Sequence, residues 1–80
     1  MITGLQIRSA RAALRLSIDA LAKLSGVSAR TIKRMESDDG QPISNRPNVE
    51  AVQSCLEAAG IEFIGSPDDG PGIRIRVSKK

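Results

Sequence analysis

The sequence predicts a mainly α-helical domain in which four helices are followed by a short C-terminal β-hairpin. Two observations carry this prediction. Up to residue 60, apolar residues recur three and four positions apart behind residues that cap helices. After Gly60 they recur at every second position, which is typical of strands. Eighty residues are expected to form one small core. Because the period changes after Gly60, we distinguish a helical domain, residues 1–60, from a C-terminal segment, residues 61–80.

A capping residue stands before each of the first three predicted helices. Thr3 precedes a helix over residues 4–16. Ser17 precedes a second helix that stops at Gly26, and Ser28 precedes a third over residues 29–37. We expect their inner faces to consist of Ile7, Ala10, Ala13 and Leu14 in the first, Leu21, Ala22 and Leu24 in the second, and Ile32 and Met35 in the third.

The second half of the chain is predicted to begin with a loop. Residues 38–47 contain Pro42 and Pro47, which interrupt a helix. Asn48 then caps a fourth helix, which Gly60 ends and whose apolar positions are Val49, Val52, Leu56 and Ala59. Residues 61–64 and 73–77 alternate as strands do, and the segment 65–72 between them, rich in Gly and Pro, is predicted to be a loop.

The composition excludes several classes of function. One Cys and no His leave no internal disulfide and no zinc site of the usual kind, so we expect a reduced, cytoplasmic protein without metal or other cofactor. The common acid–base and nucleophilic pairs are missing as well, and we expect no enzymatic activity and no membrane segment. One Phe, with no Trp or Tyr, disfavours binding of RNA or single strands by stacking.

The charges are segregated along the chain. Residues 1–37 hold seven bases and two acids, a net charge of +5, whereas residues 38–72 hold one base and seven acids, a net charge of −6. Four bases in the last eight residues add +4. A basic block of this kind favours an anionic partner, although solvated helix faces would have the same composition.

The helices expected from Ser17 and Ser28, joined by a tight turn through Gly26, form the arrangement in which the second helix enters the DNA major groove. The segment 16–22, with Gly26-Val27-Ser28, Thr31-Ile32 and Met35-Glu36, resembles the Cro/CI-like helix-turn-helix family of phage and bacterial repressors, also called the XRE family. The resemblance covers residues 4 to about 59 and implies a lambda-repressor-like fold that binds duplex DNA.

The resemblance implies a set of DNA contacts. Arg30 and Arg34 are the strongest candidates, because they lie four apart on one helical face and arginine binds guanine O6 and N7 with two hydrogen bonds. The full set implied for base edges is Ser28, Ala29, Arg30 and Arg34, and the set for phosphates is Ser17, Lys23, Thr31, Lys33, Gln41 and Arg46. Ile18 and Ala29 depart from the polar residues common in the family, which weakens the implied contacts at these two positions.

Two further pairings follow from the resemblance and the pattern. Arg11 and Glu36 correspond to a family ion pair that holds the helix that reads DNA. The C-terminal hairpin is the expected dimer element, because it offers an open strand edge and an apolar face formed by Ile73, Ile75 and Val77. Alternatively, the hairpin folds back on its own helices and the fourth helix forms the dimer. We expect Cys55 to be a small buried hydrophobe.

Taken together, these features predict a transcriptional regulator, a repressor, that binds an inverted-repeat operator as a homodimer. Two recognition helices would then lie roughly 34 Å apart in successive major grooves. Such a protein would be cytoplasmic and associated with the nucleoid when bound to DNA. The competing interpretation is a protein of the same fold that binds a protein partner, as an antiactivator or antitoxin does.

Overall fold

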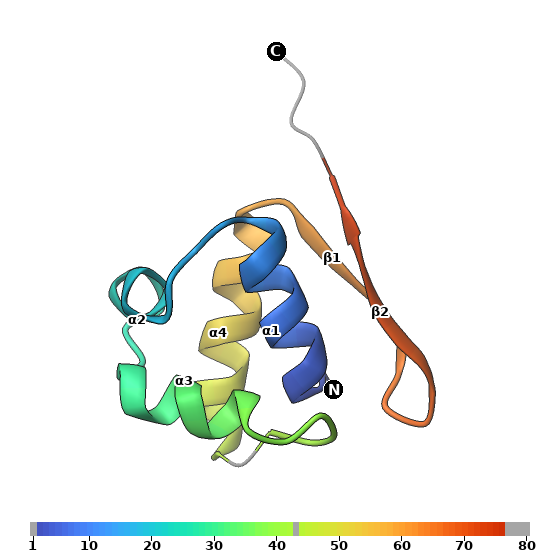
Figure 1. Ribbon diagram of the computed structural model, residues 1–80, viewed down its shortest axis with the longest axis horizontal. Helices are drawn as coiled ribbons and strands as arrows, with labels where there is room; N and C mark the ends of the chain where they lie inside the picture. The colour runs from blue at the N-terminus through green and yellow to red at the C-terminus, as the bar shows by residue number, and fades with distance from the viewer. Residues whose placement is uncertain (1, 43, 77–80) are drawn as a thin grey trace.

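The computed structural model describes residues 2–42 and 44–76. It contains four helices and a two-stranded antiparallel sheet (Figure 1). The elements are α1 (Gly4–Ala13), α2 (Ile18–Ser25), α3 (Ala29–Glu36), α4 (Arg46–Ala58), β1 (Ile61–Ser66) and β2 (Asp69–Ile75). The predicted fold, mainly helical with a C-terminal hairpin, is therefore confirmed.

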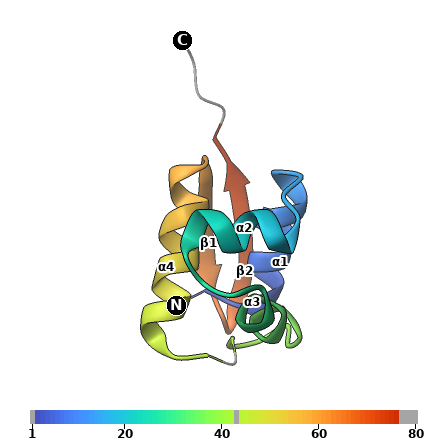
Figure 2. The same ribbon diagram turned by 90° about the vertical axis from the view of Figure 1, so that its left-hand side faces the viewer.

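The elements are stacked in three layers. Helices α1 and α4 form the middle layer, and each contacts one strand of the hairpin: β2 lies on α1, and β1 lies on α4. Helices α2 and α3 pack against each other and against the middle layer. In Figure 2, α2 and α3 face the viewer and the hairpin lies behind α1 and α4. The hairpin therefore covers the side of the middle layer opposite to α2 and α3.

The core lies between the helices and continues under the hairpin. Its fully buried side chains include Ile7, Leu21, Ile32, Met35, Val52 and Leu56, and Ile61 of β1 joins them. Phe63 and Ile73 pack against this core from the sheet. Three predicted inner positions are wrong, because Ala13, Leu24 and Ala59 are exposed. Leu24, 64% exposed, falls outside the stripe that Ile18, Leu21 and Ala22 turn toward the core.

Helix α4 begins earlier than the sequence predicts. Asn45, not Asn48, is its N-cap, and the Asn45 side chain accepts a hydrogen bond from the Asn48 N–H at 3.0 Å. Pro47 lies in the first turn of the helix, where the N–H that proline lacks would have no partner in the helix. The predicted loop over residues 38–47 is therefore wrong at its end. Helix α1 is shorter than predicted and ends at Ala13 rather than at residue 16.

The hairpin is longer than predicted, and the expected loop over residues 65–72 is wrong. Strand β1 runs to Ser66 and β2 starts at Asp69, so only two residues form the turn. Gly65 and Gly70 adopt φ values of +76° and +63°, which side chains disfavour, and a register shift between Ile64 and Ser66 lets pairing continue through the glycine-rich segment. Val77 lies outside the described residues.

Gln6 joins the start of α1 to the hairpin. Thr3 and Gln6 form a capping box: the Thr3 N–H donates to Gln6 Oε1 at 2.8 Å, and the Gln6 N–H donates to Thr3 Oγ1 at 3.1 Å. The Gln6 side-chain NH2 group donates to the carbonyl oxygens of Ile64 at 3.0 Å and Gly72 at 2.7 Å. A two-stranded hairpin alone is marginal, so this buried amide helps to fix it on the helices.

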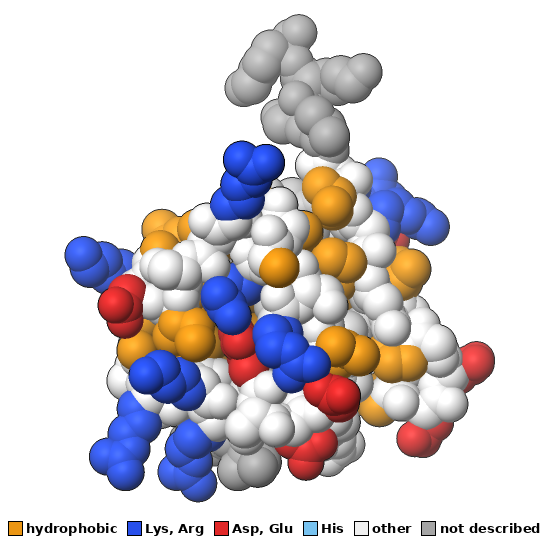
Figure 3. Space-filling view, in the orientation of Figure 1, with side chains coloured by type: hydrophobic (Ala, Val, Ile, Leu, Met, Phe, Trp, Pro, Cys, Tyr) orange, Lys and Arg blue, Asp and Glu red, His pale blue; other side chains and the backbone are white. Residues whose placement is uncertain are grey.

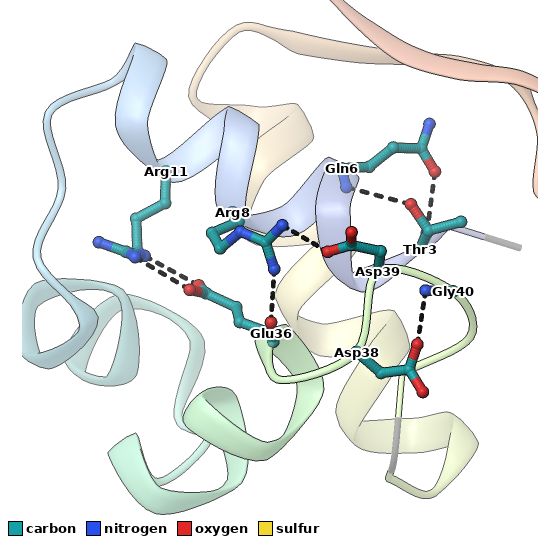
Figure 4. A network of polar contacts seen from close by, with 8 residues as sticks. All are labelled: Thr3, Gln6, Arg8, Arg11, Glu36, Asp38, Asp39 and Gly40. Carbon is teal, nitrogen blue, oxygen red and sulfur yellow. Dashed lines mark hydrogen bonds and ion pairs between the residues drawn. The ribbon is translucent and has the colours of Figure 1, made fainter.

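The end of α3 and the loop after it are fastened to α1 by two arginines (Figure 4). Arg11 binds Glu36 with two hydrogen bonds, from Nε to Oε2 at 2.8 Å and from Nη2 to Oε1 at 2.9 Å. Arg8 donates to the Glu36 carbonyl at 2.6 Å and to the Asp39 carboxylate at 2.5 Å. The Gly4 N–H donates to the Gly40 carbonyl at 2.8 Å, so the loop also caps α1.

The Arg11–Glu36 pair is mostly removed from water. The Arg11 side chain is 22% exposed and that of Glu36 is 6% exposed. The hydrogen bonds to Glu36 raise the pKa of Arg11 above its ordinary value, although burial acts in the opposite direction. The third nitrogen of the same guanidinium, Nη1, donates to the Leu16 carbonyl at 3.0 Å. One side chain therefore ties the end of α3 and the connection before α2 to α1.

Gly4→Ala is expected to destabilise the protein by about 2–3 kcal/mol, because a Cβ at this position would overlap the main-chain carbonyl oxygens of Met35 and Asp38. Chemical denaturation measures the loss. Gly40→Ala is the matched control in the same loop, since its Cβ would meet only the Asp38 side chain at 3.4 Å. Equal stabilities of the two variants would contradict the close approach of α1 to the loop.

Arg11→Met is expected to lower the free energy of unfolding by about 2–4 kcal/mol, because it leaves the Glu36 carboxylate buried without its partner. Thermal and urea unfolding measure this loss. The double variant Arg11→Met/Glu36→Leu should recover a large part of it, since no charge then remains buried. Arg74→Met, which breaks an exposed ion pair with Glu62, is the control and should cost less than about 1 kcal/mol.

Candidate nucleic-acid interface

The turn between α2 and α3 has the geometry that two short helices at a sharp angle require. Ser17 caps α2 and accepts from the Ala20 N–H at 3.0 Å; Ser28 caps α3 and accepts from the Thr31 N–H at 3.2 Å. Between them Gly26 adopts φ +77°, in the left-handed region, and ends α2. Val27 is buried in the turn. This is the arrangement in which the second helix is presented to a groove.

Helix α3 is sharply divided into an inner and an outer face. Ile32, Met35 and Glu36 are buried, so the helix has one fixed rotation about its axis. The predicted base-reading residues lie on or beside the other face: Ser28, Arg30 and Arg34 are exposed, and Ala29 is half-buried. Lys33 is exposed beside them. A rigid helix that presents cations on one face can enter a groove without rearranging its core.

The Lys and Arg side chains that the structure describes fall into two groups, those with an ion-pair partner and those without one. Ion pairs hold Arg8, Arg11, Arg46, Arg74 and Arg76. In residues 2–42 and 44–76, no ion pair reaches the remaining five, which we call the unpaired cations: Arg15, Lys23, Arg30, Lys33 and Arg34. All five lie in α2, in α3 or in the connection before α2.

Charged side chains are distributed unevenly over the surface. Figure 3 shows Lys and Arg side chains gathered at the lower left, where Figure 1 has α3, and acidic side chains at the right, where it has the hairpin turn. A cation without a carboxylate partner keeps its full attraction for an external anion. The outer side of α2 and α3 is therefore the part of the described surface best suited to a polyanion.

The structure places the residues expected at phosphates in two regions. Three of them are exposed on the helix-turn-helix side: Ser17 at the N-cap of α2, Lys23 in α2 and Lys33 in α3. Gln41 and Arg46 are exposed in the loop after α3 and in the first turn of α4, and Arg46 pairs with Glu50 at 3.6 Å. The hydroxyl of Thr31, half-buried, accepts a hydrogen bond from Ser28 Oγ at 2.9 Å.

A polar hollow of about 270 Å³ lies between α3 and the start of α4. Thr31 and Arg34 line it from α3, and Ser44, Asn45 and Asn48 line it from the other side. The DNA contacts that the sequence predicts include Thr31 and Arg34 but none of the last three residues. The local sequence does indicate a helix start, because Asn45 is a capping residue and Pro47 suits a first turn. That this helix start lies close to α3, however, depends on tertiary packing.

Three further features of the described residues bear on function: the Cys55 thiol, the grouping of possible metal ligands, and the length and polarity of the helices. Cys55 is half-buried and packs against the core, and burial raises the pKa of its thiol above the ordinary value. Within residues 2–42 and 44–76, no three side chains of Cys, Asp or Glu are grouped as metal ligands would be. No helix in this part of the chain is long and apolar enough to cross a membrane.

Comparison with known proteins supports the geometric interpretation. A search of the curated proteins found no match. A family model described as a helix-turn-helix domain matches residues 3–62 of the 80. The match spans α1, α2, the turn, α3 and α4, which are the elements that build the surface described above. The chain therefore belongs to the helix-turn-helix domain family.

Proposed function

We propose that the protein is a transcriptional regulator of the Cro/CI-like type that binds a specific duplex DNA sequence as a homodimer and represses transcription. The observation that carries this proposal is the set of unpaired cations on α2, α3 and the connection between α1 and α2. In this proposal α3 enters the major groove, and the bound dimer occupies DNA that the transcription machinery needs. The protein acts in the cytoplasm, at the nucleoid when bound.

Sequence reading is assigned to the exposed face of α3. Arg30 and Arg34 lie one helical turn apart in α3, and each guanidinium can bind a guanine edge with two hydrogen bonds. Ser28 and Ala29, at the start of the helix, complete the set; the Ala29 methyl group is suited to a thymine methyl group. The phosphate contacts, which position the protein without reading sequence, are assigned to Ser17, Lys23, Thr31, Lys33, Gln41 and Arg46.

The layers of the fold favour one mode of dimerisation. Ile61, Phe63 and Ile73 face the helices of their own chain, so the apolar face of the hairpin is already used. Its outer face carries the Glu62 carboxylate, paired with Arg74 and Arg76, and is unsuited to a dry interface. The open strand edges and Ile75, which is 55% exposed, are the features left for a second copy.

Symmetry supports the same choice. If two hairpins packed face to face, the helical layers would lie on opposite outer sides and the two α3 helices would point away from each other. If two hairpins paired edge to edge, the twofold axis would be perpendicular to the sheet, and all helices would lie on one side of it. Only the second arrangement lets both α3 helices approach one duplex. We therefore assign the dimer contact to a hairpin edge next to Ile75, in place of the apolar face.

One observation favours the alternative function. Leu24 is exposed on α2, outside the stripe that packs on the core, so part of the proposed DNA-facing side is apolar. A protein partner would use such a side chain, whereas a phosphate backbone would not. In this alternative the same helix-turn-helix surface binds a protein, as an antiactivator or antitoxin does.

Arg30→Ala and Arg34→Ala are each expected to weaken binding to the preferred duplex, selected from random sequences, by about 1–3 kcal/mol, or roughly 5- to 150-fold. Each variant should also relax the preference for one base position. Fluorescence anisotropy at fixed salt measures both effects. Arg74→Ala, on the outer face of the hairpin, is the control and should bind as the wild type does. No sequence preference of the wild type at moderate salt would refute the regulator and favour the protein-binding alternative.

Ile75→Lys is expected to convert a dimer into a monomer, because lysine next to a strand edge opposes pairing with an identical edge. Sedimentation velocity measures the change, and the fold should persist since Ile75 is mostly exposed. Ser54→Lys, on the exposed side of α4, is the matched control and should stay dimeric. Dissociation by Ser54→Lys alone would assign the interface to α4, and a monomeric wild type would refute the homodimer.

A further inference from the structure

Arg15 is the one residue other than glycine with a positive φ among residues 2–42 and 44–76. Its φ of +58° belongs to the turn that ends α1. The Leu16 N–H donates to the Arg11 carbonyl at 2.9 Å, and the Arg15 N–H donates to the Ala12 carbonyl at 3.1 Å. This pair of bonds is the Schellman ending of a helix, in which glycine is the usual residue at the left-handed position. Arginine there makes the free protein less stable than glycine would.

No contact within the described residues compensates for the unfavourable conformation of Arg15. The Arg15 side chain is exposed and, within the described part of the chain, forms no hydrogen bond or ion pair. Two acidic side chains that contact α1 already have other partners, since Glu36 pairs with Arg11 and Asp39 pairs with Arg8. A residue held in an unfavourable conformation without an internal partner points to a role outside the free molecule.

The position of Arg15 indicates what that role is. The connection in which it lies leads from the α1 and α4 layer to the α2 and α3 layer (Figure 1). Arg11 Nη1 fixes the next carbonyl, that of Leu16, at 3.0 Å, and Ser17 then caps α2. Arg15 is thus carried on a rigid segment at the entrance to α2, and it is the first of the unpaired cations along the chain.

We propose that Arg15 binds a phosphate of the DNA backbone beside the N-terminus of α2 and so flanks the contact made by α3. This inference rests on the proposed function. A guanidinium is suited to the site because it stays charged and can donate two parallel hydrogen bonds to one phosphate. The contact adds affinity and fixes the position of α2 on the duplex, and it reads no base.

The variant Arg15→Gly separates the effect of Arg15 on stability from its effect on DNA binding. Its melting temperature should rise by a few degrees, because glycine adopts the left-handed conformation without strain. Its affinity should fall equally for the preferred duplex and for random duplexes, and the slope of log Kobs against log salt should become shallower by about 0.9. Arg15→Lys is the matched control: it retains the charge and the strain, so the salt slope should stay as in the wild type.

The outcomes distinguish this inference from the function on which it rests. If the wild type prefers one duplex sequence but Arg15→Gly keeps its affinity and salt slope, Arg15 makes no phosphate contact and this inference alone is refuted. If Arg15→Gly weakens only the preferred duplex, the residue reads sequence and the inference is also wrong. If the wild type binds no duplex, the proposed function fails and the assignment of Arg15 fails with it.

Discussion

The bidentate contact between Arg11 and Glu36 is the interaction on which the presentation of α3 depends. A helix of eight residues is unstable by itself, and only Ile32 and Met35 anchor the middle of α3 in the core. Glu36 fixes the end of that helix to α1, and the same guanidinium holds the Leu16 carbonyl ahead of α2. The Arg11 side chain therefore holds both the end of α3 and the connection before α2 against α1. The angle between α2 and α3 is set by these contacts with α1 as well as by the turn at Gly26.

Arginine has two separate roles in this small fold. Arg8 and Arg11 belong to the basic first part of the chain, yet their charges are turned toward Glu36 and Asp39 and stabilise the molecule internally. Within residues 2–42 and 44–76, the unpaired cations all lie between Arg15 and Arg34. The acidic middle of the chain therefore has a structural role, because Asp39 pairs with Arg8 at the surface and neutralises one charge of the basic first part of the chain.

Local signals made most of the fold predictable from the sequence. Ser17, Gly26 and Ser28 act within their own turns, and so α2 and α3 were placed correctly. Pro47 was misinterpreted because proline both ends helices and starts them, and the packing around Asn45 decides between the two. The base-reading and phosphate residues came from family resemblance and remain predictions. The hollow at Ser44 and the hydrogen bonds of Gln6 join segments remote in sequence, which no local pattern reveals.

The Gln6 amide has a consequence for the order in which parts of the chain fold. Its two acceptors lie 58 and 66 residues further along the chain, so these hydrogen bonds form only after segments far apart in sequence have met. Helices α1 to α4 can pack together before the hairpin docks, but the Gln6 NH2 group reaches its two carbonyl acceptors only when the hairpin lies on α1. Contacts of such long sequence separation form slowly, so closure of the hairpin is expected to be the final step of folding.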